Sequence, residues 1–200
     1  MKKVIISTVA AILFCVSCKK EDNNVVDRKP VQSFSGINLG NQSSVNYTCF
    51  LTLDSCRVYS LASAKANQGI IDLIFLHNDP DNLAMFVTPA SIASAITYTP
   101  VIYSNLTNGI TTWSTKNSMQ LGITDISVAD FNGINTNGAL NSAYENDPHV
   151  TIGWEIDITA GKVYKFTSNR TGKRGLIKVN SINGNFASAG GINMDIKMIN

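Results

Sequence analysis

The chain has 200 residues, of which 44% are hydrophobic and 15% are charged, and its formal net charge is +2. This length suffices for one domain with a substantial core. Removing residues 1–17 takes away Lys2 and Lys3 and leaves 14 basic and 14 acidic residues. A neutral domain has no electrostatic reason to bind nucleic acid, so that class of partner is excluded from the expected functions.

The first residues have the layout of a secretory signal peptide. Lys2 and Lys3 precede a short apolar run over 4–16, and small, polar and charged residues follow it. This order of segments is typical of exported proteins. A membrane-spanning helix needs about 20 apolar residues, and the run is shorter than that. We therefore expect residues 1–17 to direct export and to be removed.

Two cysteines, Cys15 and Cys18, lie at the end of the apolar run. Val16-Ser17-Cys18 resembles the lipobox of bacterial lipoproteins, in which a small residue precedes the cysteine that is cleaved and lipidated. Ser17 fits the small position, whereas cleavage before Cys15 would place Phe14 there. Cys15 itself stands where the lipobox usually has Leu. The resemblance implies cleavage between Ser17 and Cys18 and lipid attachment at Cys18.

The residues after Cys18 extend this resemblance. Lys19-Lys20-Glu21-Asp22 is similar to the lysine and acidic tag of Bacteroidetes-type lipoproteins that reach the cell surface. The resemblance implies an outer-membrane protein that is lipid-anchored and surface-exposed, with the membrane as its partner through the anchor. Residues 18–30 are polar and charged, so we expect a flexible tether there. Residues 31–200 would then form a single domain.

Alternating or β-branched apolar runs separated by turn residues predict a sheet protein. The run at 69–76 is almost continuously apolar and is expected to be a central strand buried on both faces. Strands are expected at 33–39, 45–53, 57–61, 69–76, 83–87, 118–123, 150–156, 162–167, 175–182 and 192–199. This pattern predicts an all-β fold, a single-domain antiparallel β-sandwich or flattened barrel with one or two short helices.

Two helix starts are visible. Thr88-Pro89 has the form of an N-cap followed by Pro at the first helical position, which predicts a short helix over 90–96. Ser127 and Asp130 have capping-box spacing and predict a second short helix. The Asn- and Gly-rich stretch 132–148 is expected to be a surface loop or two short helical turns. Residues 97–103 are expected to be extended.

Cys49 and Cys56 remain in the mature chain, and an oxidising compartment permits a disulfide between them. If Asp54-Ser55 is the two-residue turn, Cys56 faces Leu53 and Cys49 lies several residues further along the hairpin. Disulfides need Cα atoms within about 7 Å. The register of this hairpin therefore disfavours a Cys49–Cys56 disulfide. The disulfide remains an alternative that the sequence leaves open.

Further segments resemble a broad set of uncharacterised all-β lipoproteins of unknown function. They are Leu53–Tyr59, Ile71-Asp72, Trp113 with Asn117, Gly161–Phe166 and Gly172–Val179. Within the first of them, Cys56 stands where the pattern has a turn glycine. The resemblance implies a fold and carries no catalytic motif.

The two histidines, His77 and His149, each adjoin an Asn-Asp-Pro turn. If the two loops converged, the pair could ligate a metal or haem iron, as in a haemophore-like lipoprotein. Two ordinary loop histidines are the simpler interpretation. Asp72 lies inside the most apolar strand, where an unpaired charge is costly. We expect a structural role in which it meets a backbone amide, a Tyr or an Arg.

Four loop carboxylates are the candidates for glycan hydrolysis or calcium binding, namely Asp79, Asp81, Glu145 and Asp147. Glycosidases need two carboxyl groups about 5–10 Å apart, which a sequence does not show. Solvated turn acids are the simpler interpretation. Aromatic residues in polar segments suit sugar stacking or, more simply, packing: Tyr98, Tyr103, Trp113 and Tyr144.

No nucleophile elbow, phosphate loop or metal-binding motif occurs in the sequence. We therefore predict no catalytic residues, no metal ligands and no cofactor. The expected function is a non-catalytic domain of the cell envelope that binds a ligand or partner, with a glycan, haem or a protein as candidates. The alternatives are a haem- or metal-binding protein, a glycan-active enzyme, and an adhesin or assembly subunit.

Overall fold

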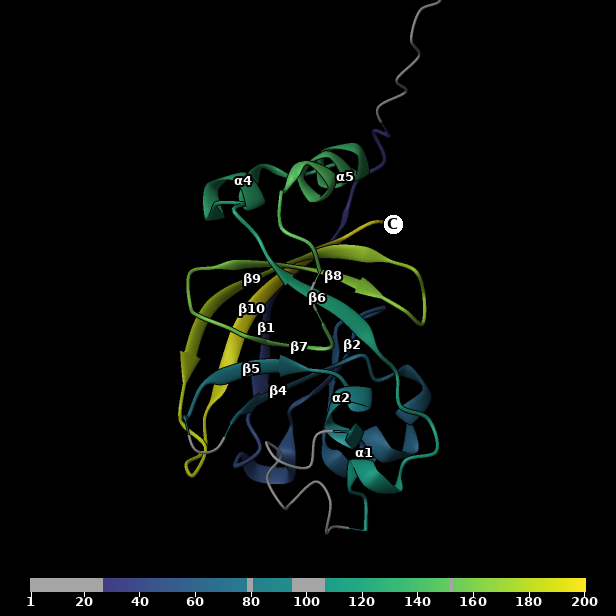
Figure 1. Ribbon diagram of the computed structural model, residues 1–200, viewed down its shortest axis with the longest axis vertical. Helices are drawn as coiled ribbons and strands as arrows, with labels where there is room; N and C mark the ends of the chain where they lie inside the picture. The colour runs from purple at the N-terminus through teal and green to yellow at the C-terminus, as the bar shows by residue number, and fades with distance from the viewer. Residues whose placement is uncertain (1–26, 79–80, 95–106, 152) are drawn as a thin grey trace, which may run out of the picture.

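The computed structural model describes residues 27–78, 81–94, 107–151 and 153–200. Two five-stranded antiparallel sheets pack face to face at its centre (Figure 1). The predicted all-β sandwich is therefore confirmed. The predictions for the signal peptide, the lipobox and the segment 97–103 lie outside the described residues.

The spatial order of the strands differs from their order in the chain. Across the first sheet the order is β1 (Gln32–Gly40), β10 (Gly191–Met198), β9 (Arg174–Asn183), β8 (Val163–Ser168) and β6 (Met119–Ile123). Across the second sheet it is β3 (Arg57–Tyr59), β2 (Phe50–Thr52), β4 (Leu73–His77), β5 (Ala84–Val87) and β7 (Glu155–Asp157).

Short helices cover the outer faces of both sheets. Figure 1 shows α4 (Val128–Gly133) and α5 (Asn137–Asn146) over the first sheet, and α1 (Leu61–Ala66) and α2 (Pro89–Ser94) at the opposite end beside the second. Three 3₁₀ turns complete the described elements, η1 (Val45–Tyr47), η2 (Gln68–Ile70) and η3 (Ile110–Thr112). Among the described helices, none combines the length and hydrophobicity that a membrane crossing needs.

The layers enclose three hydrophobic clusters. The largest lies between the sheets and includes Phe75, Phe86 and Phe166. A second lies between the second sheet and its helices, around Phe50 and Trp113. A third, around Phe131 of α4 and Leu140 of α5, seals the outer face of the first sheet.

Strand β4 is buried on both faces, as its continuous apolar run predicts. Leu73 and Phe75 belong to the cluster between the sheets. Ile74 and Leu76 belong to the cluster under α1 and α2. Since successive strand residues point to opposite faces, a strand between two apolar layers has no polar side. This explains why the run shows no alternation.

Both predicted helix starts are present. The Ser127 side chain accepts a hydrogen bond from the Asp130 backbone, and the Asp130 side chain accepts one from the Ser127 backbone, which makes a complete capping box. The Thr88 Oγ1 accepts a hydrogen bond from the Ser91 backbone N–H at 3.2 Å and caps α2. Both signals act between residues three positions apart, so they do not depend on the rest of the fold.

Other helical segments differ from the prediction. Residues 45–47 and 68–70 form 3₁₀ turns where strands are expected, and α1 is a helix that the prediction does not include. The stretch 132–148 holds one helix of ten residues, α5. Helices α1 and α5 each follow an N-cap, Ser60 and Thr136, whose side chain accepts a hydrogen bond from the backbone N–H three positions on. These local signals mark helix starts that the strand and loop predictions did not include.

The two sheets are bridged along the side of β6 and β7, and on the opposite side the pairing of β1 with β10 contains a bulge. Leu121 of β6 forms an antiparallel bridge with Gly153, just before β7, so this bridge connects the two sheets along this side. On the opposite side β1 is an edge strand of the first sheet, and its pairing with β10 shifts register between Phe34 and Ile37. A bulge of this kind blunts an edge against pairing with other chains.

Candidate functional site

Cys49 and Cys56 are not joined by a disulfide. The register of β2 and β3 pairs Phe50 with Tyr59 and Thr52 with Arg57, as expected from a turn at 54–55. Cys49 therefore packs into the cluster beneath α1, whereas Cys56 packs against the cluster between the sheets. The two sulfurs lie on opposite faces of the second sheet, so a Cys49–Cys56 disulfide does not form.

Cys56 occupies a turn conformation that favours glycine. Its φ of 48° lies in the left-handed region, where the sequence pattern also places a turn glycine. Burial, together with the nearby charges of Asp54 and Asp72, raises the pKa of the Cys56 thiol to about 12. A thiol with so high a pKa is a poor nucleophile, so Cys56 is assigned no chemistry.

Asp72 has the structural role expected from the sequence. Its side chain is fully buried, and its carboxylate receives two hydrogen bonds from Arg170, at 3.0 and 2.8 Å. The Leu53 backbone N–H donates a third at 2.9 Å. Arg170 also contacts Asp54 at 2.9 Å. The ion pair between Asp72 and Arg170 connects the β2–β3 turn with the turn after β8, and so links the two sheets.

His77 and His149 occupy different environments. His77 is 2% exposed, its ring lies 5.3 Å from that of Phe75, and burial lowers its pKa. The His149 Nδ1 instead lies 3.4 Å from a carboxylate oxygen of Asp147. No group of three or more His, Cys, Asp or Glu side chains suited to a metal ion occurs in the described part of the chain. The geometry gives the haem or metal alternative no support.

The described loop carboxylates are exposed to solvent or engaged in ion pairs. Asp81 is an exposed turn residue, and Glu145 forms an ion pair with Arg174. The candidate at position 79 lies outside the described residues. These positions therefore give the hydrolase alternative no support.

Asp147 is engaged in an ion pair inside the protein. Its side chain is 2% exposed and lies 3.0 Å from the Lys165 Nζ. Burial opposes ionisation of Asp147, but hydrogen bonds from the Asp125 and His149 backbones and from Lys165 outweigh it, so its pKa lies below the ordinary value. A carboxylate held in this way has a structural role.

The two described candidate aromatic residues are packed, and neither presents a free stacking face. Trp113 is 2% exposed, lies 5.6 Å from the Phe50 ring and donates its indole N–H to the Asn108 carbonyl at 2.9 Å. The Tyr144 hydroxyl bonds Thr167 at 2.7 Å, with the Lys165 ammonium 5.3 Å from its ring. The interpretation of these residues as packing is therefore confirmed.

The structure instead forms a pocket around Tyr47, which we call the Tyr47 pocket. Its volume is about 330 Å³. It lies where η1 meets α1 and the segment before η3. The described lining consists of Asn46, Tyr47, Ser60, Leu61, Ala62, Thr107 and Asn108.

The loop that carries Tyr47 is held in a strained conformation. Asn46 and Tyr47 have φ values of 60° and 51°, which side-chain-bearing residues seldom adopt. The Tyr47 backbone N–H donates to the Ser44 carbonyl at 3.0 Å, and Ser44 Oγ accepts from the Thr48 N–H at 3.2 Å. A Cβ at Gly40 would clash with the Ser44 hydroxyl, so only glycine allows this approach. Strained residues of this kind cluster at ligand-binding sites.

The lining of the Tyr47 pocket is uncharged in its described part. Asn46 and Asn108 offer amide donors and acceptors, Thr107 offers a hydroxyl, and Tyr47 offers an aromatic ring. The Ser60 hydroxyl also lines the pocket and is engaged with Ser63 as the N-cap of α1. Pockets that combine apolar or aromatic walls with a few polar groups are the usual sites for small ligands. The arrangement suits a neutral ligand rich in hydroxyl groups.

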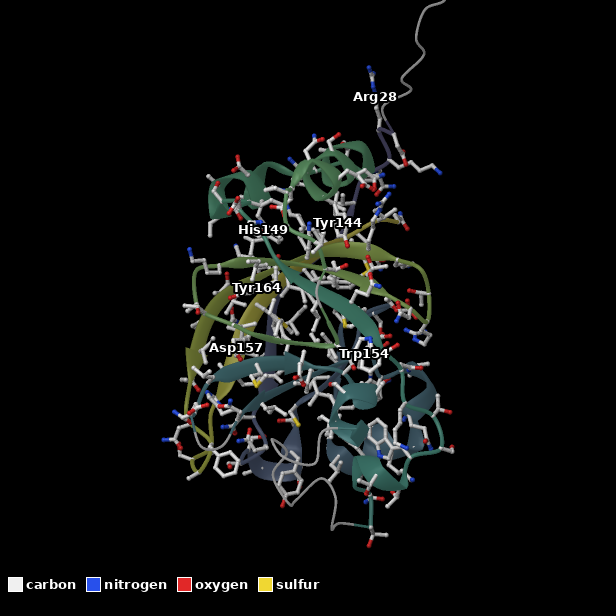
Figure 2. The ribbon with its side chains drawn as sticks, in the orientation of Figure 1. Arg28, Tyr144, His149, Trp154, Asp157 and Tyr164 are labelled. Atoms are coloured by element: carbon white, nitrogen blue, oxygen red, sulfur yellow. The ribbon has the colours of Figure 1, made fainter. Side chains whose placement is uncertain are left out.

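The start of the described chain lies at the other end of the molecule. The Gly138 and Asn137 backbone N–H groups, at the beginning of α5, donate to the carbonyls of Asp27 and Lys29, each at 2.8 Å. Figure 2 shows Arg28 beyond the same end as Tyr144 of α5, while Figure 1 places α1 at the far end. The Tyr47 pocket and the N-terminal segment are therefore at opposite ends of the domain.

Comparisons with known proteins provide a fold and no activity. No protein-family model matches the chain, and no curated protein matches it in sequence. A crystal structure of a DUF4466 family protein from Parabacteroides merdae is similar, with a TM-score of 0.50 and 14% identity. At this identity the likeness establishes a shared fold. The match covers 84% of this chain and 53% of that one, so this chain spans about half the length of its structural neighbour.

Sequence reasoning misses two aromatic residues. The alternation at 45–53 places Tyr47 in a strand, which hides its position in a pocket. Trp154, just before β7, is 50% exposed, and the strand expected at 150–156 gives no sign of this. The one sequence signal for the Tyr47 loop is Asn46, because Asn tolerates the left-handed conformation better than most residues.

Proposed function

We propose that the protein is a non-catalytic lipoprotein of the cell envelope that binds a neutral, hydroxyl-rich ligand, of the glycan class, in the Tyr47 pocket. The observation that carries the proposal is the pocket lining, which combines one aromatic ring with four amide or hydroxyl side chains. Aromatic rings pack against apolar ligand faces. Amides and hydroxyls can both donate to and accept from sugar hydroxyl groups.

The lining favours binding over hydrolysis. Glycosidases place two carboxyl groups on either side of the scissile bond, and the described lining residues include no Asp or Glu. The carboxylates Glu145 and Asp147 are engaged in ion pairs elsewhere. A pocket of about 330 Å³ fits one or two sugar rings at the end of a longer chain.

The position of the pocket suits an anchored receptor. Lipid attached at Cys18 would hold the protein at the end where residues 27–29 contact α5. The Tyr47 pocket would then face away from the outer membrane, toward ligands in the medium. A lipoprotein anchor with more than one acyl chain makes such attachment stable, since each buried methylene contributes about 0.8 kcal/mol.

Truncation of the aromatic ring tests the ligand site. We expect Tyr47→Ala to weaken binding of the best ligand from an immobilised glycan panel by about tenfold, because partial burial of an aromatic ring against a ligand contributes roughly 1–1.5 kcal/mol. Tyr47→Trp should retain binding. Affinity is measured on the purified full-length protein, with thermal unfolding to verify folding.

Tyr144→Phe is the matched control for this experiment, because it alters a tyrosine at the opposite end of the domain. Its glycan affinity should equal that of the wild type. If Tyr47→Ala and the wild type bound every glycan equally, the Tyr47 pocket would not be the site.

Lipidation is tested by metabolic labelling with a fatty acid. We expect Cys18→Ala to abolish incorporation of the label and to leave the precursor uncleaved, because the thiol that accepts the lipid is gone. Cys15→Ala should be labelled like the wild type. Label retained in Cys18→Ala and lost in Cys15→Ala would assign the anchor to Cys15 instead.

A further inference from the structure

An open groove is lined by residues of α4 and α5 and of the segments beside them. Figure 1 shows these two helices at the end of the domain opposite α1, which lines the Tyr47 pocket. The volume of the groove is about 600 Å³. We call it the α4/α5 groove. Its apolar lining consists of Ile126, Ala129, Ile134, Ala143 and Pro148.

The polar part of the same lining carries negative charge. Asp125, Asp130 and Asp147 lie in it. The Asp147 carboxylate is already paired with Lys165 at 3.0 Å. The Asp125 side chain is 73% exposed, and Asp130 is exposed on the first turn of α4. Asp125 and Asp130 are thus exposed beside an apolar floor, and no Lys or Arg is among the described lining residues. Asp130 Oδ2 also accepts the capping-box hydrogen bonds from Ser127, and Asp125 lies 3.8 Å from the His149 Nδ1.

Exposed aliphatic side chains continue the apolar surface past the groove. Val128 of α4 is 38% exposed and lies within three positions of both accessible carboxylates. Val150 is 73% exposed and follows the lining residue Pro148 by two positions. Large apolar side chains that stay exposed next to a concave surface are typical of interaction sites.

We propose that the α4/α5 groove binds a peptide segment in which a Lys or Arg side chain is flanked by aliphatic side chains. The aliphatic groups pack on the floor formed by residues such as Ile126 and Ala143. The basic head group lies between Asp125 and Asp130. Charge complementarity selects this partner, because an acidic or anionic surface would be repelled by two accessible carboxylates.

The α4/α5 groove and the Tyr47 pocket share no described residue, so binding at one can be tested without the other. The charge of the groove also distinguishes a protein partner from an anionic membrane surface. A negative groove disfavours anionic lipid head groups, so phosphatidylglycerol vesicles added without peptide should leave the amide signals of the groove residues unchanged.

The test uses a hexapeptide that alternates lysine and leucine, titrated into the purified, ¹⁵N-labelled full-length protein. We expect saturable binding, with amide shift changes concentrated at 125–134 and 143–150. The double variant Asp125→Asn with Asp130→Asn should weaken binding at least about fivefold, because two exposed charge contacts are lost. The same peptide with glutamate in place of lysine should not bind.

Matched variants locate the site. Ala129→Lys adds a positive charge inside the groove at an exposed helical position, and it should abolish binding. Ser142→Lys adds the same charge on an exposed position of α5 outside the described lining and should bind like the wild type. The proposal is overturned if both variants bind equally, if the glutamate peptide binds as well as the lysine peptide, or if phosphatidylglycerol vesicles alone shift the same amide signals.

Discussion

Replacement of Asp72 by alanine is expected to lower the free energy of unfolding by about 3–5 kcal/mol, the usual cost of breaking a buried ion pair. The Asp72 side chain is fully buried, and Arg170 is 20% exposed. The variant would remove both hydrogen bonds from Arg170 to Asp72, leave Arg170 with only the more exposed carboxylate of Asp54, and leave the Leu53 backbone N–H without its acceptor. A guanidinium is not deprotonated in proteins, so Arg170 cannot relieve the loss by giving up its charge.

Urea unfolding of the purified protein measures this effect. Asp54→Ala is the matched control, because it removes the other carboxylate partner of Arg170, whose side chain is 43% exposed. Exposed pairs contribute about 0–1 kcal/mol, so the control should lose no more than that. A loss below about 1 kcal/mol for Asp72→Ala would contradict the structural role.

Replacing both partners distinguishes a buried charge penalty from lost packing. The double variant Asp72→Leu with Arg170→Met removes both charges together, and it should recover part of the stability lost in Asp72→Ala. If the double variant were less stable than the single one, the packing around Asp72 would matter more than its charge.

Replacement of Asp147 by alanine is the second large effect. Lys165 is 3% exposed, and its Nζ lies 3.0 Å from the Asp147 carboxylate and 5.3 Å from the Tyr144 ring centroid. Without Asp147 the ammonium loses its anionic partner inside the protein. We expect a loss of about 3–5 kcal/mol at neutral pH. Asp157→Ala, at an exposed position of β7, should cost less than about 1 kcal/mol.

The pH dependence of this effect has a defined sign. The pKa of Asp147 is lowered in the folded state, so the unfolded chain binds more protons as the solution becomes acidic. Its stabilising contribution is complete above the unfolded pKa of about 3.9. It is lost as the pH falls through the lower folded pKa.

Urea unfolding at about pH 7, 4 and 2.5 measures the difference in stability between the wild type and Asp147→Ala. The difference should be largest at neutral pH and should shrink at the lowest pH. A difference that stayed constant across this range would show that Asp147 acts through packing and not through its charge.

The sequence by itself determined the features that depend on neighbouring residues. The capping box of Ser127 and Asp130, the Thr88 cap of α2 and the turn at 54–55 are set by side chains within a few positions of one another. The alternating patterns of the long strands β1, β9 and β10 are likewise readable, because a sheet with one apolar face requires a period of two.

The tertiary structure alone decided which distant residues meet. A buried Asp72 needs a partner, but only the packed sheets select Arg170, 98 positions away. The Tyr47 loop forms a 3₁₀ turn and not a strand. Hydrogen bonds to Ser44 and packing against the cluster beside α1 stabilise this turn and offset the strain of its backbone. Helix α5 forms because Leu140 fills a cluster on the outer face of the first sheet. Both the Tyr47 pocket and the α4/α5 groove are surfaces between separate elements, so no local pattern encodes them.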